Sequence, residues 1–148
     1  MSALSAGRAV EISSVVVDTN VLVSAFWSHN RRAPSQILGL LLERRLKAVY
    51  CWEILQEYET VLLRPEFKFH PAQVRSLLNF IETEGISVVP AFVDIPFTDE
   101  ADRKFYAAAK AACSVLVTGN KRHFPDDECV LSPAEFIDLY VASALNNG

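Results

Sequence analysis

The chain lacks a surplus of positive charge. Its 148 residues include 14 lysines and arginines against 18 aspartates and glutamates, which gives a formal net charge of -4. This balance excludes a basic electrostatic field over the whole surface, of the kind that attracts nucleic acids from a distance. If the protein binds RNA or DNA, local basic residues or bound cations must neutralise the phosphates.

Cysteine is scarce as well. The three cysteines, Cys51, Cys113 and Cys129, are odd in number and match no zinc-binding spacing. Each lies in or beside an apolar run, so we expect all three to be small buried hydrophobic residues. Unpaired cysteines are typical of a reducing compartment, and the sequence therefore predicts a cytoplasmic protein.

The motifs of several common catalytic classes are also missing. The five glycines form no glycine-rich phosphate loop. The three histidines, His29, His70 and His123, lie in polar or loop stretches and give no support to a serine–histidine–aspartate triad. No histidine–cysteine cluster indicates zinc. We therefore expect neither a nucleotide-binding loop, nor a hydrolytic triad, nor a zinc centre.

A long apolar run is absent from the start of the chain. Residues 1–13 hold one arginine and no extended hydrophobic segment, so they are predicted to be neither a signal peptide nor a transmembrane helix. We expect them to form a flexible N-terminal extension, with one domain over residues 14–148 and no membrane association. That length suffices to bury a core without disulfides or structural metals.

What the chain does have is a regular alternation of apolar runs and amphipathic segments, with 51% hydrophobic and 22% charged residues. The predicted strands cover 15–17, 47–51, 86–89, 114–118 and 129–131. The predicted helices cover 21–27, 34–45, 52–63, 71–84 and 100–112, and a last helix begins at Ser132. This alternation predicts an α/β fold in which helices cover both faces of a mainly parallel sheet of four or five strands.

One carboxylate stands at the end of the first predicted strand. Three valines at 15–17 indicate a fully buried strand, and Asp18, Thr19 and Asn20 follow it directly. In open α/β sheets, ligands bind at the carboxyl ends of the strands. Asp18 either caps the helix that follows or serves as a metal ligand or general base, and the hexapeptide alone does not choose between these roles.

Further acids stand in two other segments. The helix over 52–63 carries Glu53, Glu57 and Glu59, and the last two border its apolar stripe on opposite sides, so periodicity does not choose between them. Asp99 and Asp102 lie three residues apart at the start of the helix over 100–112, where acids are also common for purely structural reasons.

The predicted strand over 114–118 repeats the design of the first one. It ends in Thr118, Gly119 and Asn120, so a neutral oxygen ligand follows this strand. Carboxylates that gather at one strand-end crevice repel each other unless cations neutralise them. Mg²⁺ and Mn²⁺ suit such oxygen-only sites, and they activate water for attack on phosphodiesters. The residues therefore predict a metal-dependent hydrolase.

Four segments in order resemble the PIN-domain family, and within it the VapC-like nucleases that act as toxins of toxin–antitoxin modules. They are residues 17–24, 57–65, 99–102 and 116–124. The resemblance implies a three-layer α/β/α PIN-like domain and a Mg²⁺- or Mn²⁺-dependent endoribonuclease that cleaves single-stranded or structured RNA. It also implies a cognate antitoxin as partner, and a homodimer.

The resemblance also assigns roles to residues. It implies Asp18, Glu57 and Asp102 as catalytic residues, and thereby favours Glu57 over Glu59. The implied metal ligands are Asp18, Glu57, Asp99, Asp102 and Asn120, and the implied supporting residues are Thr19, Asn20, Ser24 and Thr118. In one respect the chain departs from the family pattern: Asn120 stands where a fourth acid is usual, which puts binding of a second metal in doubt.

Contacts with the substrate rest on weaker patterns. The candidate phosphate-binding residues are Arg31, Arg32, Lys121, Arg122 and His123, all in predicted loops. Trp27 and Phe124 are aromatic side chains suited to stacking on bases, but we expect both to pack in the core.

Two other functions compete with the ribonuclease hypothesis. The first is a catalytically weak PIN-fold module that binds RNA or protein, because Asn120 replaces an acid. The second is a metal-dependent phosphatase that acts on small phosphate esters.

Overall fold

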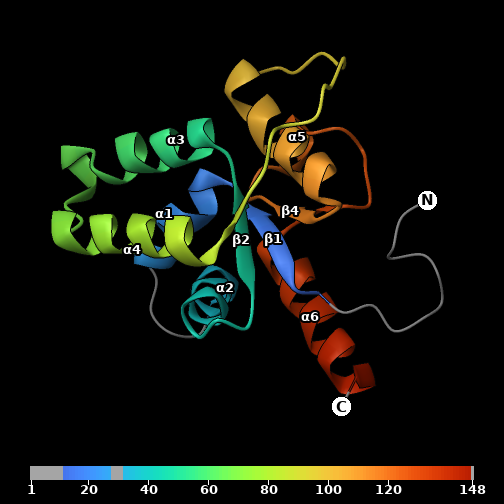
Figure 1. Ribbon diagram of the computed structural model, residues 1–148, viewed down its shortest axis with the longest axis horizontal. Coiled ribbons are helices and arrows are strands. Elements are labelled where there is room, and N and C mark those ends of the chain that lie inside the picture. Colours follow the sequence, from blue (N-terminus) through green and yellow to red (C-terminus); the bar gives the residue numbers. More distant parts are fainter. Residues whose placement is uncertain (1–11, 28–31, 148) are drawn as a thin grey trace.

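A five-stranded parallel sheet forms the centre of the computed structural model, which describes residues 12–27 and 32–147 (Figure 1). The strands are β1 (Ser14–Val17), β2 (Lys47–Tyr50), β3 (Ile86–Ser87), β4 (Val115–Val117) and β5 (Val130–Leu131). Their order is β3-β2-β1-β4-β5, and every neighbouring pair is parallel. In this register Val17 lies opposite Val117, so the residues that follow β1 and β4 are neighbours.

Six α-helices surround the sheet in the described residues. They are α1 (Thr19–Trp27), α2 (Ala33–Leu42), α3 (Trp52–Leu62), α4 (Pro71–Glu84), α5 (Arg103–Ala112) and α6 (Pro133–Asn147). Three short 3-10 helices are η2 (Pro65–Phe67), η3 (Glu100–Asp102) and η4 (Lys121–His123).

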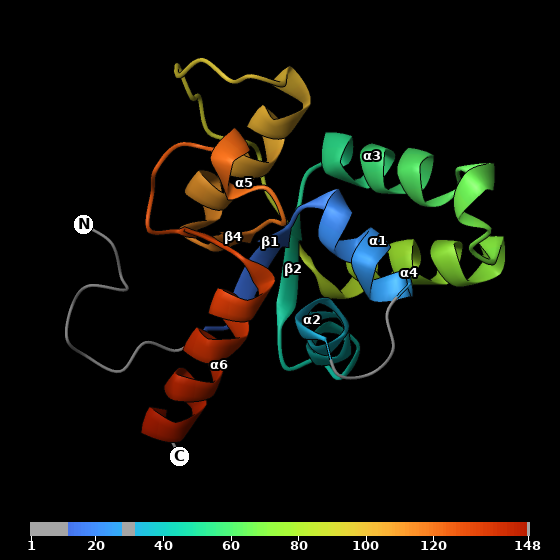
Figure 2. The same cartoon turned by 180° about the vertical axis from the view of Figure 1, so that it is seen from behind.

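The helices form two layers because the chain crosses the sheet in two directions. From β1 through β2 to β3 it moves one way, and it then returns across the sheet to β4. Right-handed crossovers therefore place α1 to α4 on one face and α5 on the other. Figures 1 and 2 show α1, α3 and α4 grouped on one side of the strands, with α5 on the opposite side. The predicted α/β fold with helices on both faces is confirmed.

The core is built from the apolar runs that the sequence indicates. Val15 and Val16 of β1 are fully buried, as are Leu116 of β4 and Phe105 of α5. Phe136, on α6, is also completely enclosed. This packing fixes the central strands, and with them the strand ends that carry Asp18 and Thr118.

Most elements differ by a few residues from their predicted bounds, as β3 and α5 illustrate. β3 ends at Ser87 instead of residue 89. The Val88 N–H still donates to the Tyr50 carbonyl (2.9 Å), but Pro90 has no N–H and cannot continue the ladder. The helix predicted over 100–112 begins as η3 and becomes α5 only at Arg103.

At the N-terminus, the folded part of the chain begins earlier than residue 14. Ile12 is buried in the core, and the Ser13 carbonyl accepts a hydrogen bond from the Lys47 N–H (2.9 Å). Residues 12 and 13 therefore belong to the domain and not to the extension expected over 1–13. The rest of that extension, residues 1–11, lies outside the described residues.

The expectations about five single side chains are only partly confirmed. Cys51 is buried and Cys129 is partly buried, but the prediction for Cys113 is wrong: it is exposed, and its φ of 52° ends α5 in the left-handed region. Phe124 is buried as expected, whereas Trp27 is 59% exposed, so its predicted place in the core is also wrong. Trp27 instead contacts the rings of Phe67 and Phe69 at the far end of α1.

Within the part of the chain that the structure describes, no helix is both long enough and apolar enough to cross a membrane.

Candidate active site

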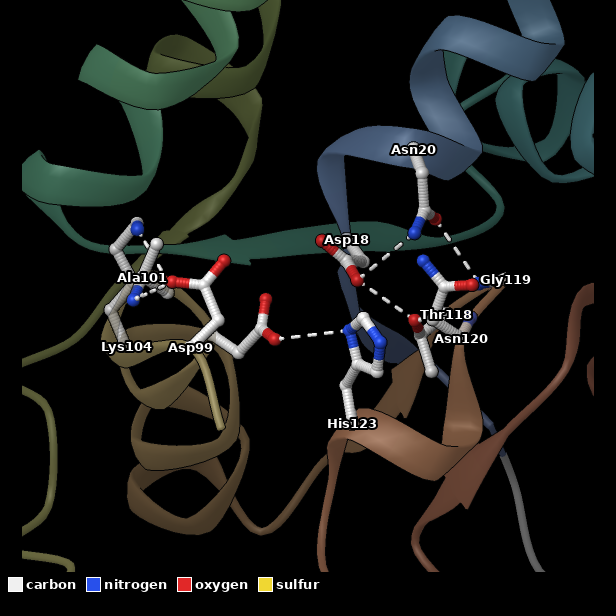
Figure 3. Close-up of polar contacts among 10 residues, drawn as sticks. Asp18, Asn20, Asp99, Ala101, Lys104, Thr118, Gly119, Asn120 and His123 are labelled. Atoms are coloured by element: carbon white, nitrogen blue, oxygen red, sulfur yellow. Dashed lines mark hydrogen bonds and ion pairs between the residues drawn. The ribbon is translucent and has the colours of Figure 1, made fainter. Parts of the chain in front are cut away.

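Asp18 lies at the carboxyl end of β1, where the chain turns directly into α1. Its backbone N–H donates to the Val117 carbonyl (2.9 Å), and its own carbonyl accepts from the Val21 N–H (2.9 Å), which starts the helix. Its carboxylate accepts from the Thr118 hydroxyl (2.8 Å) and from Asn20 Nδ2 (3.4 Å) (Figure 3). Residues of two elements therefore fix the Asp18 carboxylate: Thr118 at the end of β4 and Asn20 in α1.

The carboxyl of Asp18 is unusually easy to protonate. Burial raises its pKa from 3.8 to about 6, and the negative charges of Asp102 and Glu57 add to the rise. The Thr118 hydroxyl opposes it, because its hydrogen bond favours the ionised form. A buried carboxyl beside two others is a site that a bound cation would stabilise in its charged state.

Glu57 reaches the same strand ends from α3. The position of α3 is fixed by Tyr58, whose buried hydroxyl donates to the Val17 carbonyl immediately before Asp18. The Glu57 side chain is 24% exposed, with Oε1 2.7 Å from Lys104 Nζ and Oε2 accepting from the Thr19 hydroxyl. Glu59 is exposed, and so is Glu53. The structure thus places Glu57, of the three glutamates on this helix, beside Asp18.

Asp102, the last residue of η3, supplies the third carboxylate. Its Oδ2 atom is shielded from solvent and has no hydrogen-bond partner, and His123 Nδ1 lies 3.5 Å away, too far for a hydrogen bond. Burial raises the pKa of Asp102, the charges of Asp99 and Glu57 raise it further, and His123 and Lys104 oppose the rise. A buried acceptor without a hydrogen-bond donor is energetically costly, so a ligand at Asp102 Oδ2 would be stabilising.

Asp99 occupies a more exposed position at the start of η3. One of its carboxylate oxygens accepts from the Ala101 N–H (3.0 Å), so Asp99 caps this turn. Its charge still acts on Asp102, as the raised pKa of that residue shows. Asp99 is therefore placed at the edge of the site, with its second oxygen available to a ligand that approaches from solvent.

The end of β4 contributes a network of polar groups. Thr118 is fully buried; its hydroxyl donates to Asp18 and accepts from the Asn120 N–H (3.0 Å). The Gly119 N–H donates to Asn20 Oδ1 (3.1 Å), which ties this turn to α1 (Figure 3). Asn120 itself is exposed, so its amide is not a buried replacement for the usual acid.

The predicted substrate-contacting residues differ in where they lie. His123, in η4, faces Asp102, and Arg122 beside it is exposed. Lys121 forms an ion pair with Glu135 (2.9 Å), which offsets its charge. Arg32 is exposed at the start of α2, and Arg31 lies outside the described residues. Ser24, predicted as a supporting residue, is on the exposed side of α1.

Sequence reasoning missed two residues of this site, Lys104 and Tyr58. Lys104 contacts Glu57 from α5, and Tyr58 fixes α3 against β1. Neither contact follows a local spacing rule, since each joins elements that are distant in the sequence. Tyr58 was recognisable as a core residue from the stripe of its helix, but the partner of its hydroxyl was not.

The donor set fits a hard divalent cation, although its side chains are not gathered around one point. Among the described residues, no three histidine, cysteine, aspartate or glutamate side chains converge closely enough to hold a metal ion together. Lys104 and Thr19 engage both oxygens of Glu57. The chemistry nevertheless matches Mg²⁺ or Mn²⁺, because the candidate ligand atoms are oxygens. One of them, Asp102 Oδ2, is buried without a hydrogen-bond donor.

Comparison with known proteins gives the family of the chain. Residues 14–122 match the PIN domain family, a range that includes every predicted metal ligand. The chain belongs to the PIN-domain family. PIN domains are generally nucleases and commonly bind divalent metals. The chain is also similar to an uncharacterized protein of Methanocaldococcus jannaschii, with 29% identity over 110 residues, which cover 72% of this chain and 70% of the relative.

Proposed function

We propose that this PIN domain is a Mg²⁺- or Mn²⁺-dependent endoribonuclease, with Asp18, Glu57 and Asp102 as its metal ligands. The observation that carries the proposal is that these three carboxylates, from three elements, lie at one edge of the sheet and act on one another's charge. The charges of Asp102 and Glu57 both raise the pKa of Asp18, and the charge of Glu57 also raises the pKa of Asp102. A bound divalent cation would relieve this repulsion.

The chain's own residues orient the donors of this site. Thr118 and Asn20 hold the Asp18 carboxylate, and Thr19 holds Glu57. A bound divalent ion would supply a more acidic water and would stabilise negative charge on the phosphate. Asp99 and Asn120 lie at the exposed border of the site, where their oxygens would reach the ion directly or through water. No residue of the chain needs to form a covalent bond with the substrate.

RNA is the proposed substrate, in single-stranded or structured form. Because the net charge is -4, phosphate contacts must be local. His123 and Arg122 are the best placed of the basic candidates, since η4 lies beside Asp102. Arg32 is exposed at the start of α2, whereas Lys121 would first have to leave Glu135.

The proposal extends to the biological setting through the family resemblance. We propose that the protein acts as the toxin of a toxin–antitoxin module and is held inactive by a cognate antitoxin, and that it forms a homodimer. Growth arrest on expression, and co-purification with a small antitoxin protein, test the toxin role. Absence of arrest by an active nuclease would remove the toxin role and leave the chemistry intact.

Cleavage assays test the chemistry directly. Purified protein should cut RNA with Mg²⁺ or Mn²⁺ and stop cutting in EDTA, and Asp18→Asn should abolish cleavage without lowering Tm. Glu59→Gln, on the exposed side of the same helix as Glu57, serves as the matched control and should cut normally. If wild-type protein cuts no RNA with either metal across the workable pH range, the ribonuclease proposal fails.

A binding module is the second candidate, and the exposed Asn120 favours it. If Asn120 leaves the site unable to complete its metal coordination, RNA binding without cleavage is expected. Calorimetric titration with RNA in Mn²⁺, alongside the cleavage assay, separates the two. Hydrolysis of an aryl phosphate without any cleavage of RNA would instead support the phosphatase.

A further inference from the structure

Lys104 places a positive charge inside the carboxylate cluster. It lies in the first turn of α5, two residues after Asp102, and its side chain is only 19% exposed. Its Nζ lies 2.7 Å from Glu57 Oε1 and donates to the Ala101 carbonyl (2.5 Å). The charge also acts on Asp102, against the repulsion from the neighbouring carboxylates. The site therefore contains a cation of its own, held in place by the backbone that precedes α5.

This ammonium engages an oxygen that a metal ion would need. Of the two Glu57 oxygens, Oε1 pairs with Lys104 and Oε2 accepts from the Thr19 hydroxyl. A hydroxyl is neutral and can rotate to another acceptor. The ammonium is charged and repels a divalent ion at the same carboxylate. Lys104 is thus the group whose position decides how easily Glu57 can become a metal ligand.

An ordinary structural ion pair predicts something different. If Lys104 only braced α5 against α3, its removal would loosen the site and weaken metal binding together with stability. If instead it neutralises Glu57 in competition with the metal, its removal has two effects of opposite sign. The metal-free protein loses stability, because Glu57 is left without its counter-charge. Metal binding tightens, because the ion no longer competes with the ammonium.

We propose that Lys104 is the internal counter-cation of this site: it neutralises Glu57 while no metal is bound and competes with a divalent ion for that carboxylate. The inference rests on the metal-dependent function proposed above. On metal binding, Nζ would give up Glu57, and its contact with the Ala101 carbonyl would keep the ammonium at the site.

The test uses the full chain without RNA. Lys104→Met keeps the length of the side chain and removes its charge. We expect the Kd for Mn²⁺, measured by calorimetry, to fall about tenfold, as is usual when one charge is removed from a partly buried cluster. We expect Tm in EDTA to fall in the same variant. Lys104→Arg keeps the charge and should keep the Kd near that of the wild type.

Lys110→Met is the matched control on the same helix. Lys110 forms an ion pair with Asp127, away from the three carboxylates, so its loss should lower Tm and leave the Kd for Mn²⁺ unchanged. A double-mutant cycle adds a second check. In a Glu57→Gln background there is no carboxylate for Lys104 and the metal to compete for, so Lys104→Met should no longer tighten Mn²⁺ binding.

The possible outcomes distinguish the counter-cation role of Lys104 from the metal-dependent function on which it rests. If Lys104→Met leaves the Kd for Mn²⁺ unchanged or raises it in a folded protein, the counter-cation role is overturned and the metal site stands. If wild-type protein binds no Mn²⁺, both proposals are overturned. If Lys104→Met does not fold, as judged by circular dichroism, Lys104→Gln takes its place, with the same expected fall in Kd and the same contrary result.

Discussion

At the scale of single residues, Asp18 shows how burial and charge set the chemistry of this site. Its pKa rises from 3.8 to about 6 because the carboxyl is buried and because Asp102 and Glu57 lie nearby. Between these two pH values the folded, metal-free protein binds a proton that the unfolded chain has released. The free energy of unfolding contributed by Asp18 therefore falls as the pH rises through this window.

Asp18→Asn should remove this loss of stability at higher pH, because the amide carries no charge. We expect the variant to exceed the wild type in free energy of unfolding by about 2–3 kcal/mol at pH 7.5 in EDTA, with a smaller difference at pH 4.5. Urea unfolding at several pH values measures the difference. Asp94→Asn, at an exposed carboxylate, should show no such trend. A variant less stable than the wild type at pH 7.5 would contradict the raised pKa.

Glu57 and Glu59 provide a paired test on one helix. Glu57→Gln should weaken Mn²⁺ binding at least about tenfold, because a charged ligand is replaced by a neutral amide. Glu59→Gln changes the net charge equally on the exposed side of α3 and should leave the Kd for Mn²⁺ as it is. Equal losses in both variants would show that overall charge, and not ligation, controls metal binding.

At the scale of elements, the site depends on two contacts that fix a helix or a loop. Tyr58 joins α3 to the end of β1, and Asp127 joins the segment before β5 to α5. Asp127 accepts from the Tyr106 hydroxyl (2.7 Å), from Lys110 Nζ and from the Cys129 N–H (2.9 Å). The same segment follows η4, so these bonds help to hold His123 near Asp102.

Tyr58→Phe should cost about 1–2 kcal/mol of stability, because it removes a buried hydrogen bond to the Val17 carbonyl. It should also weaken Mn²⁺ binding, since α3 carries Glu57. Tyr50→Phe is the control: its hydroxyl donates to the Glu82 carbonyl (3.0 Å) at the surface, so the loss should be smaller and the Kd unaffected. A Tyr58→Phe protein as stable as the wild type would show that the hydroxyl does not anchor α3.

Asp127 should show a pH dependence of the opposite sign to that of Asp18. Although burial alone would raise its pKa, hydrogen bonds from Lys110, Cys129 and Tyr106 hold the pKa of this carboxyl well below its usual range. Its stabilising effect is present above pH 4 and is lost as the pH falls.

Asp127→Asn should therefore lower the free energy of unfolding by about 1 kcal/mol at pH 7, a modest loss because the ion pair with Lys110 is partly exposed. The loss should be smaller at pH 3. Urea unfolding at the two pH values measures both differences. Asp126→Asn, at the exposed neighbouring residue, is the control. A loss that grows as the pH falls would contradict the lowered pKa.

At the scale of the whole molecule, the alternation of apolar runs predicts the parallel sheet, and the residues after β1 and β4 predict where the site lies. Periodicity does not distinguish Glu57 from Glu59, because both border the same stripe; the difference arises only when α3 packs beside β1. Lys104 is not predictable from spacing, because its contact with Glu57 depends on how α5 crosses the sheet. The wrong prediction for Cys113 has a local cause: apolar neighbours suggest burial, but the residue ends a helix in the left-handed conformation.

The position of a bound ion tests the central claim most directly. Crystals soaked in Mn²⁺, with diffraction recorded for the anomalous signal of manganese, would show which oxygens hold it. We expect one strong peak at the carboxyl end of the sheet, with Asp18 and Asp102 Oδ2 as direct ligands and Glu57 turned away from Lys104. No peak at this edge at saturating Mn²⁺, or a peak held by other residues, would contradict the account.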